Sequence, residues 1–408
     1  MTLQKGFGMD ILCLMGLYPD EYREEIESQS IKGMQYAADK LQKAIIKGLA
    51  SIDGVEVSIV NSLYIGSYPK KYRSLRIPSF EFSCQGRIKG VNVGFVNLTV
   101  LKWFSRYFNT KKAVEQWAKV KTDQEKILLI YAMTTPFMQI ASYIGKKYKN
   151  VKICVVVPDL PDYMNTAAMG ERSFYRLAKN AEISMIRSSI RHVDSYVLLV
   201  DTMKEWFGYP VRYTVVEGIA SGSIESVQNA PKKKSILYAG GIKHEYGVAD
   251  LIESFIKADA AQWELLIYGD GADLEAIRKM ASDYPNIKIM GARANEEVVA
   301  EQRKASILVN PRKNQVFTRY SFPSKILEYM ASGTPMLAYK LEGVPDEYDK
   351  YYYHIDESQD GFVDALKSVM QLTEEERQQK GKEAQEFVIK CKNPKVQCKK
   401  IVELLKNS

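Results

Sequence analysis

Short blocks of apolar, largely β-branched residues recur along this chain, and each is separated from the next by a longer segment. In the first half the blocks occupy residues 9–15, 55–60, 127–132, 151–157 and 195–200. Segments with helical periodicity lie between them, at about residues 29–49, 111–121, 136–147 and 172–190. This alternation predicts a parallel β-sheet covered by helices, because parallel strands need crossover connections and are buried on both faces.

The alternation stops at residues 218–234, where Gly, Ser, Asn, Pro and a run of lysines gather as in an interdomain linker. It then restarts, with strands expected at 235–241, 263–271, 286–291, 306–311 and 335–340. A chain of 408 residues is long enough for two domains. We therefore predict an α/β protein with Rossmann-like domains at residues 1–217 and 235–372. Two helices should follow over residues 373–408, with a break near Asn393-Pro394.

The most informative segment reads RYSFPSKILEYMASGTPMLAY. Pro323 suits a first helical turn and Gly333 suits the position just past a helix end, so the two bracket a helix of about ten residues. On that helix Ser324, Lys325 and Glu328 share one face. The unpaired amides, the helix dipole and Lys325 would suit a diphosphate, and Glu328 would accept hydrogen bonds from a ribose diol. The alternative is a surface helix whose glutamate is solvated.

Three further loops follow strands of the second predicted sheet. They are Gly240-Gly241-Ile242-Lys243, Gly269-Asp270-Gly271 and Asn310-Pro311-Arg312. In open α/β sheets, ligands bind outside the carboxyl ends of the strands. Each loop alone is ordinary turn sequence, but with the helix that follows Pro323 four segments converge on one edge, which indicates a ligand site there.

The motifs YAGGIKHEYGVADLIESF, IYGDGADLEAI, NIKIMG, SILVNPR and YSFPSKILEYMASGTPMLAYKLEGVP follow one another between residues 235 and 348. This arrangement resembles the donor-binding half of retaining GT-B glycosyltransferases, in particular family 4-like enzymes of bacterial capsule and exopolysaccharide biosynthesis. The resemblance implies two facing Rossmann-like domains, the second binding a nucleotide-sugar and the first an acceptor. It also implies that the C-terminal helices cross back to the N-terminal domain.

The resemblance also implies roles for individual residues. By position, Glu328 matches the glutamate that binds the nucleotide ribose, and Ser324 and Lys325 match the helix-start contacts to the diphosphate. Arg293 lies in the loop that recognises the base. The other donor-side candidates are Gly241, Lys243, Gly269, Asp270 and Tyr320.

The chain departs from that family pattern at three positions. Many members have a second glutamate eight positions before the ribose glutamate, where this chain has Tyr320. Many also have an arginine and a lysine in the first loop, where this chain has Gly241 and Tyr246. Other cations would then have to balance the diphosphate, and the candidates are Lys243, Arg312, Arg319 and Lys325. We expect Arg312 and Lys325 to take part in catalysis.

In the first predicted domain, the segment VVVPDLPDYM ends a strand with Asp159 and Asp162. Family members often place a histidine or aspartate here, and Asp159 would orient the acceptor hydroxyl or help remove its proton. The alternative is that Asp159 caps a turn between two prolines. The loop after the first strand, with Gly16 and Tyr18, is expected on the acceptor side.

Positive charge is concentrated in one segment. Residues 62–126 hold 13 Lys and Arg against four Asp and Glu, a balance of +9 in a chain whose total is +8. Within it, Lys102, Trp103, Arg106 and Phe108 mix cations with aromatic rings, which suits an anionic membrane face and a polyprenyl-diphosphate-linked acceptor. The alternative is ordinary fold surface with a solvated basic rim. No nucleic-acid reader motif accompanies the charge.

We therefore predict an enzyme, a glycosyltransferase that retains anomeric configuration and uses a nucleotide-diphosphate-sugar. Five cysteines without CxxC spacing predict a cytoplasmic protein, and scattered histidines predict no metal. A saccharide or a lipid-linked saccharide is the expected acceptor. Two alternatives stay open at this stage: a nucleotide-sugar epimerase of the same architecture, and a non-catalytic scaffold of a polysaccharide assembly complex.

Overall fold

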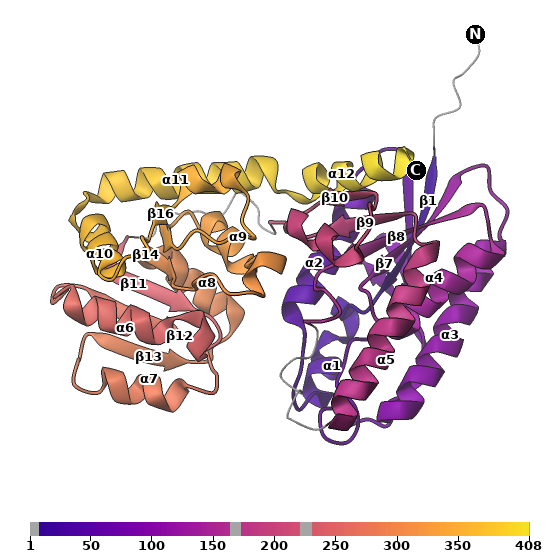
Figure 1. The fold of residues 1–408 in the computed structure, drawn as a ribbon, viewed down its shortest axis with the longest axis horizontal. Helices are drawn as coiled ribbons and strands as arrows, with labels where there is room; N and C mark the ends of the chain where they lie inside the picture. The colour runs from indigo at the N-terminus through magenta and orange to yellow at the C-terminus, as the bar shows by residue number, and fades with distance from the viewer. Residues whose placement is uncertain (1–7, 164–172, 221–230, 408) are drawn as a thin grey trace, which may run out of the picture. The chain divides into compact units, whose positions relative to one another are not determined.

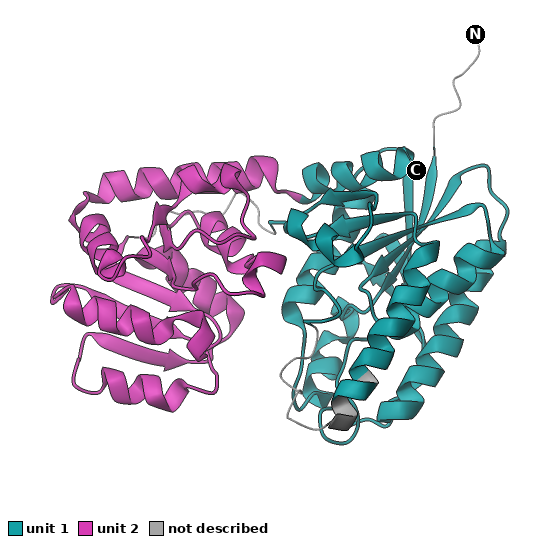
Figure 2. Ribbon diagram, in the orientation of Figure 1, with its two compact units in different colours: residues 1–221, 394–408 teal, residues 222–393 magenta. Residues whose placement is uncertain are grey.

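The computed structural model describes residues 8–163, 173–220 and 231–407. The chain divides into two compact units, with residues 1–221 and 394–408 in unit 1 and residues 222–393 in unit 2 (Figure 2). Most of the predicted linker, residues 218–234, lies outside the described residues. Each unit is built on a parallel sheet, so the predicted fold class of two Rossmann-like domains is confirmed.

The sheet of unit 1 has the strand order β10-β9-β8-β7-β1-β2-β5-β4. Its parallel strands are β1 (Met9–Met15), β2 (Val55–Asn61), β5 (Ile88–Asn92), β7 (Glu125–Tyr131), β8 (Val151–Val157), β9 (Ser195–Leu198) and β10 (Tyr213–Val215). The edge strand β4 (Phe80–Cys84) pairs antiparallel with β5, and β3 (Arg76–Ile77) pairs with β6 (Phe95–Val96) in a separate ribbon. The central strands are buried on both faces, as their continuous apolar runs predict.

The helices of unit 1 cover this sheet (Figure 1). They are α1 (Arg23–Gln29), α2 (Tyr36–Ala50), α3 (Thr99–Lys119), α4 (Thr135–Lys147), α5 (Ser173–Ser189) and α12 (Pro394–Lys406). Short 3-10 helices lie at Asp20–Tyr22, Ile190–His192 and Asp201–Phe207.

The structure of unit 1 differs from the sequence prediction in three places. Helix α3 begins at Thr99, not near residue 111, because the apolar residues in its first turns are exposed and obscure the helical period. The hairpin of β4 and β5 was missed, since its turn carries only Gln85-Gly86, whose φ angles are 54° and 69°. Helix α2 begins at Tyr36 and is also shorter than the predicted 29–49 segment.

The sheet of unit 2 has the strand order β13-β12-β11-β14-β15-β16, and every pairing is parallel. Counted along the unit this is 3-2-1-4-5-6, the order of a dinucleotide-binding fold. The strands are β11 (Lys233–Ala239), β12 (Glu264–Tyr268), β13 (Ile287–Gly291), β14 (Ala305–Asn310), β15 (Met336–Ala338) and β16 (Tyr353–His354).

The helices of unit 2 are α6 (Val248–Lys257), α7 (Leu274–Ala281), α8 (Asn295–Lys304), α9 (Ser324–Ala331), α10 (Gly361–Gln371) and α11 (Glu374–Cys391). Short 3-10 helices lie at His244–Tyr246, Thr318–Tyr320 and Asp346–Tyr351. The two C-terminal helices separate at Asn393-Pro394, as predicted. Only α12 belongs to unit 1, because α11 packs on α9 and β14 within unit 2, whereas the sequence analysis placed both with the N-terminal domain.

A glycine lets α12 pack closely on α2. A Cβ at Gly48 would lie 2.3 Å from the carbonyl oxygen of Pro394 and 2.4 Å from Sγ of Cys398. The Cys398 thiol also donates to the Ile45 carbonyl at 3.3 Å. Helix α12 can therefore pack this closely on α2 only because residue 48 has no side chain.

The substitution Gly48→Ala should therefore destabilise unit 1. Helix propensity alone would stabilise the protein by about 1 kcal/mol, but overpacking against α12 costs ~1–3 kcal/mol, so the net sign is destabilising. Urea unfolding of the full chain measures it, and Lys47→Ala at the exposed neighbouring position is the control. A Gly48→Ala protein at least as stable as the parent would show that α12 does not depend on this contact.

Candidate functional site

Three loops at the carboxyl end of the unit 2 sheet are joined by backbone hydrogen bonds. The Gly240 amide donates to the Tyr268 carbonyl, and the Gly269 amide donates to the Gly291 carbonyl, both at 2.9 Å. Gly269 has a φ of 143°, and a Cβ there would lie 1.7 Å from the Gly240 carbonyl oxygen. The chain segments after β11, β12 and β13 are therefore held in contact at the edge where this fold binds nucleotides.

The helix predicted after Pro323 is present as α9, and its two faces differ as expected. Ser324 is exposed and Lys325 and Glu328 are half-buried, while the opposite face packs into the core. Glu328 Oε1 accepts a hydrogen bond from Nε2 of the buried Gln302 at 2.8 Å. Gln302 lies on α8, 26 positions away in sequence, and no sequence signal pointed to it.

The Tyr329 hydroxyl fixes α9 against the first strand. It accepts a hydrogen bond from the Ala239 amide at 2.9 Å and donates to the Ala239 carbonyl at 3.2 Å. This bridge joins the helix to the last residue of β11, directly before the Gly240 loop. The N-terminal turn of α9 is thus positioned at the switch point between β11 and β14.

Lys325 lies above Gly240. A Cβ added at Gly240 would be 2.5 Å from Cε of Lys325 and 2.9 Å from its Nζ. The ammonium group therefore occupies the space that a side chain after β11 would fill. This places a cation beside the backbone of the first loop, where the resemblance implied a diphosphate.

Tyr246 stands where the family resemblance implies a lysine, and two cations lie near its ring. Arg312 Cζ is 5.5 Å from the ring centroid and Lys243 Nζ is 5.7 Å from it. Arg312 also lies 4.7 Å from the ring centroid of Phe317, and burial lowers the pKa of its guanidinium. The structure therefore brings Arg312 and Lys243 to one aromatic side chain. Arg319, the fourth candidate cation, forms an ion pair with Glu342 at 3.8 Å.

The remaining donor-side candidates lie at the surface or the edge of this region. Arg293 is half-exposed after β13, 4.0 Å from Glu297. Asp270 is exposed, and its Oδ1 accepts from the Gly271 amide at 2.8 Å. Tyr320 ends a 3-10 helix and lies 5.9 Å from the Arg319 guanidinium. Gly241 is half-buried beside Tyr246.

Gly16 and Tyr18, expected on the acceptor side, are both buried in unit 1. Tyr18 is 1% exposed, its hydroxyl donates to the Tyr64 carbonyl at 2.6 Å, and the same oxygen accepts from the Gln35 amide. A Cβ at Gly16 would lie 2.2 Å from Cδ1 of Tyr64. Both residues pack beneath other side chains.

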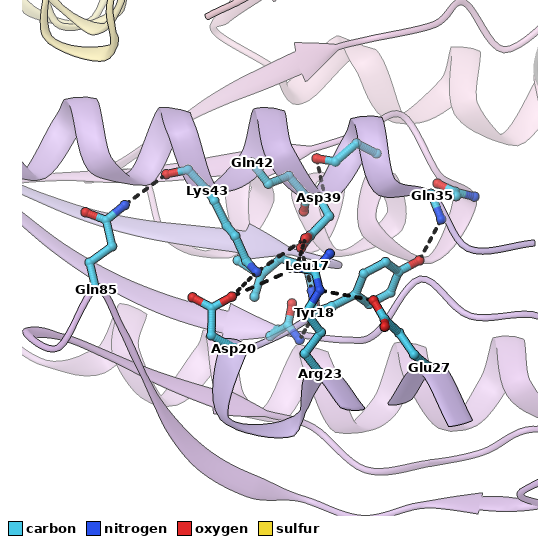
Figure 3. A network of polar contacts seen from close by, with 12 residues as sticks. Leu17, Tyr18, Asp20, Arg23, Glu27, Gln35, Asp39, Gln42, Lys43 and Gln85 are labelled. Carbon is cyan, nitrogen blue, oxygen red and sulfur yellow. Dashed lines mark hydrogen bonds and ion pairs between the residues drawn. The ribbon is translucent and has the colours of Figure 1, made fainter. Parts of the chain in front are cut away.

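The loop after β1 is held by a network around the buried carboxylate of Asp39 (Figure 3). Asp39 accepts from the Tyr18 amide at 2.7 Å, and Arg23 and Lys43 each approach it to 3.3 Å. The network is balanced by opposite charges and orders the backbone of residues 17–23. It serves the structure of the loop.

Asp159 is the second residue after β8, and its side chain is exposed at the surface, although the surrounding protein partly desolvates the carboxyl group and so raises its pKa. Asp162, three residues further on, accepts a hydrogen bond from the Trp206 indole. Asp162 therefore has a structural role as the acceptor for the Trp206 indole.

Lys102 and Arg106 point into unit 1, which corrects the expectation that they form a membrane-facing surface. Lys102 Nζ donates to the Ile65 carbonyl at 2.5 Å. Arg106 donates from Nε to Ser62 Oγ at 2.9 Å and from Nη2 to the Ser62 carbonyl at 2.7 Å. Phe108 remains exposed, at 59%, and Trp103 stacks on Tyr107.

Comparison with known proteins agrees with this geometry. Residues 223–387 match the family described as Glycosyl transferases group 1. No curated protein matches. Among solved structures, the lipopolysaccharide outer core galactosyltransferase WaaB is 15% identical with a TM-score of 0.60, over 98% of this chain and 99% of that chain.

Two further structures have the same arrangement. Sucrose-phosphate synthase from Thermosynechococcus elongatus is 12% identical with a TM-score of 0.64, over 98% of both chains. A mutant of S. aureus TarM, in complex with Fondaparinux, alpha-GlcNAc-glycerol and UDP, is 11% identical with a TM-score of 0.60, over 98% of this chain and 100% of that chain. The fold is GT-B, and the family match over residues 223–387 supports the prediction that the chain is a glycosyltransferase.

The two loop glycines should differ in what they tolerate. Gly269→Ala places a Cβ against backbone at a φ that only glycine adopts readily, so we expect a loss of several kcal/mol. Gly240→Ala meets side chains only, the end of Lys325 at 2.5 Å and the Tyr238 hydroxyl at 2.6 Å, so we expect a smaller loss of ~1–3 kcal/mol. Thermal unfolding of both variants checks this. Equal melting temperatures would mean that the Gly240–Gly269 contact does not hold the loops.

Proposed function

We propose that this glycosyltransferase moves a sugar from a nucleotide diphosphate onto a hydroxyl of a saccharide or lipid-linked saccharide, with retention of anomeric configuration. The observation that carries the proposal is the arrangement of α9, whose polar N-terminal face places Lys325 over Gly240 and Glu328 one turn further on. Helix N-termini at this edge of a parallel sheet favour phosphate groups.

In this proposal the nucleotide lies along the carboxyl ends of β11 to β14. Glu328, oriented by Gln302, accepts hydrogen bonds from the ribose hydroxyls. The α9 amides, Ser324 and Lys325 bind the diphosphate, and Arg293 lies beside the base.

Fixed positive charge supports a retaining, front-face mechanism. As the bond to the sugar breaks, negative charge grows on the departing diphosphate, and cations already in place stabilise it. Lys325 and Arg312 are our candidates, and they require no metal. The departing phosphate oxygen would accept the proton of the acceptor hydroxyl, and Asp159 would orient that hydroxyl.

We also propose a role in making a bacterial surface polysaccharide, such as a capsule or exopolysaccharide, on the cytoplasmic side of the membrane. Support comes from the names of structures with the same fold, one of which is a lipopolysaccharide outer core galactosyltransferase and one of which holds UDP. The concentration of positive charge in unit 1 also favours an anionic partner.

Replacing Glu328 tests the donor site. Glu328→Ala should weaken binding of the preferred nucleoside diphosphate by ~1.5–3 kcal/mol, about tenfold or more, because charge-assisted hydrogen bonds to ribose are lost. A thermal-shift screen of nucleoside diphosphates identifies the ligand, and calorimetry measures its affinity. Glu253→Ala, an exposed glutamate on α6, is the matched control. Unchanged affinity in a folded Glu328→Ala protein would refute the assignment.

An apolar patch on unit 1 supports peripheral membrane contact. Val100, Leu101, Phe104 and Phe108 on α3 are 47–68% exposed. The start of α3 adjoins a basic loop, because the Tyr68 amide donates to the Asn97 carbonyl and the Asn97 amide donates to the Leu75 carbonyl. The exposed cations of that loop are Lys70, Lys71, Arg73 and Arg76. None of the described helices is long and apolar enough to span a bilayer.

Binding to lipid vesicles tests this contact. The protein should sediment with anionic but not neutral vesicles, and less so as salt rises, since each surface cation contributes ~1 kcal/mol that salt attenuates. The double variant Phe104→Ser, Phe108→Ser should bind more weakly, while Val316→Ser, an exposed valine of unit 2, should bind normally. If the parent protein does not sediment with anionic vesicles at low salt, the patch is not a membrane-binding surface.

A further inference from the structure

Two cations on α3 occupy an unusual setting in unit 1. Lys102 and Arg106 are half-buried and one helical turn apart, and both lie over the Phe95 ring, at 5.8 Å and 5.3 Å from its centroid. Their hydrogen-bond acceptors are the Ile65 carbonyl and the oxygens of Ser62, which carry no formal charge. Neither cation has a carboxylate within ion-pairing distance among the residues that the structure describes.

Burial makes the charged forms of both groups less favourable. Burial, with the nearby charges of Arg106 and Lys71, lowers the pKa of Lys102 to about 7. Burial lowers the pKa of Arg106 to about 10. Two partly desolvated like charges repel each other and are unfavourable without an anion to offset them.

Lys126 shows what a purely structural lysine looks like in the same unit. It also donates to a backbone carbonyl, that of Trp117, and lies 4.6 Å from the centroid of an aromatic ring. However, Asp10 lies near it and accepts from the Trp117 indole, so a negative charge is present. Lys126 sits at the amino-terminal end of β7, away from the edge where ligands bind. Lys102 and Arg106 have no such carboxylate in the part of the chain that the structure describes.

The pair lies at the ligand-binding edge of the sheet. Arg106 Cζ is 5.4 Å from the centroid of the Tyr64 ring, which covers Gly16 at the end of β1. The Tyr64 hydroxyl donates to the carbonyl of Tyr131, the last residue of β7, at 2.5 Å. Strands β1 and β7 are neighbours, and β2 lies on the other side of β1, so this is the switch point of the sheet.

We propose that Lys102 and Arg106 form a binding site for a phosphate or diphosphate group of the acceptor. Arg106 uses Nε and Nη2 in its hydrogen bonds to Ser62, so Nη1 can donate to a ligand. The Lys102 ammonium uses one proton for the Ile65 carbonyl and has two more to donate. The exposed Lys71 adds a third positive charge nearby. The inference rests on the proposed function, in which unit 1 binds the acceptor.

The phosphate group has two chemical sources, a lipid-linked diphosphate or a soluble phosphorylated saccharide. The apolar patch of Val100, Leu101, Phe104 and Phe108 is on the same helix as the two cations. A prenyl chain would have a surface to rest on if the source is a lipid.

Calorimetric titration of the full chain with pyrophosphate tests the site. Lys102→Met keeps the aliphatic stem and should weaken binding about tenfold, as expected for one charge-assisted contact. Arg106→Lys keeps a charge but loses the planar fork, so it should weaken binding less. Lys126→Met, which removes a buried lysine remote from the site, should bind as the parent does. Lys325→Met identifies any pyrophosphate bound at the donor site of unit 2.

Absence of binding to the parent protein up to about 1 mM pyrophosphate, or equal affinity in folded Lys102→Met, would overturn the proposal. Either result leaves the Glu328-dependent nucleotide binding untouched, so failure here is distinct from failure of the donor site. Two more ligands identify the source. Tighter binding of a short-chain prenyl diphosphate than of pyrophosphate, reduced by Phe104→Ser, supports a lipid-linked acceptor. Equal binding of a sugar phosphate, unaffected by Phe104→Ser, supports a soluble one.

Discussion

In each unit, a glycine directly after the first strand leaves room for a side chain from a distant part of the chain. In unit 1 the Tyr64 ring covers Gly16, and in unit 2 the end of Lys325 covers Gly240. Both positions are the switch points of parallel sheets, where backbone polar groups and space for a ligand occur together. The two units therefore share a glycine after the first strand and differ in the side chain that covers it. Unit 1 has an aromatic ring with a hydroxyl, and unit 2 has an ammonium group.

In both units, aromatic rings contact the cations. A carboxylate in the same place would neutralise their charge, but a ring does not. Arg312 lies near Tyr246 and Phe317, and Arg106 lies near Tyr64, Phe95 and Phe137. A ring face attracts a guanidinium without cancelling its formal charge. The positive potential is then available to an anionic ligand, and low local polarity strengthens it. At Tyr246, where the family resemblance implies a lysine, the ring instead lies near Arg312 and Lys243.

The sequence predicted what depends on local pattern and missed what depends on contacts across the fold. Strand blocks such as residues 9–15 and 151–157, and helix α9 between Pro323 and Gly333, follow from periodicity and from end signals within a few residues. The burial of Tyr18 does not, because it depends on Tyr64 and Gln35, and neither does the inward direction of Lys102 and Arg106. A lysine and an arginine among aromatic residues have the same composition whether they face solvent or the core. The role of Gln302 could not be predicted either, because it depends on a hydrogen bond to Glu328 on another helix.

A bound anion would change how Lys102 and Arg106 affect the stability of unit 1. In the unliganded protein, burying Lys102 and Arg106 without a counter-charge opposes folding, and an apolar side chain of similar volume would avoid that penalty. A ligand that binds only the folded state adds RT ln(1 + [L]/Kd) to stability, which can offset the penalty whenever ligand is abundant. Asp39 and Asp10 show that this unit can supply a carboxylate to a cation elsewhere. No carboxylate of the described residues pairs with Lys102 or Arg106, and in the proposed site the phosphate of the acceptor supplies the negative charge.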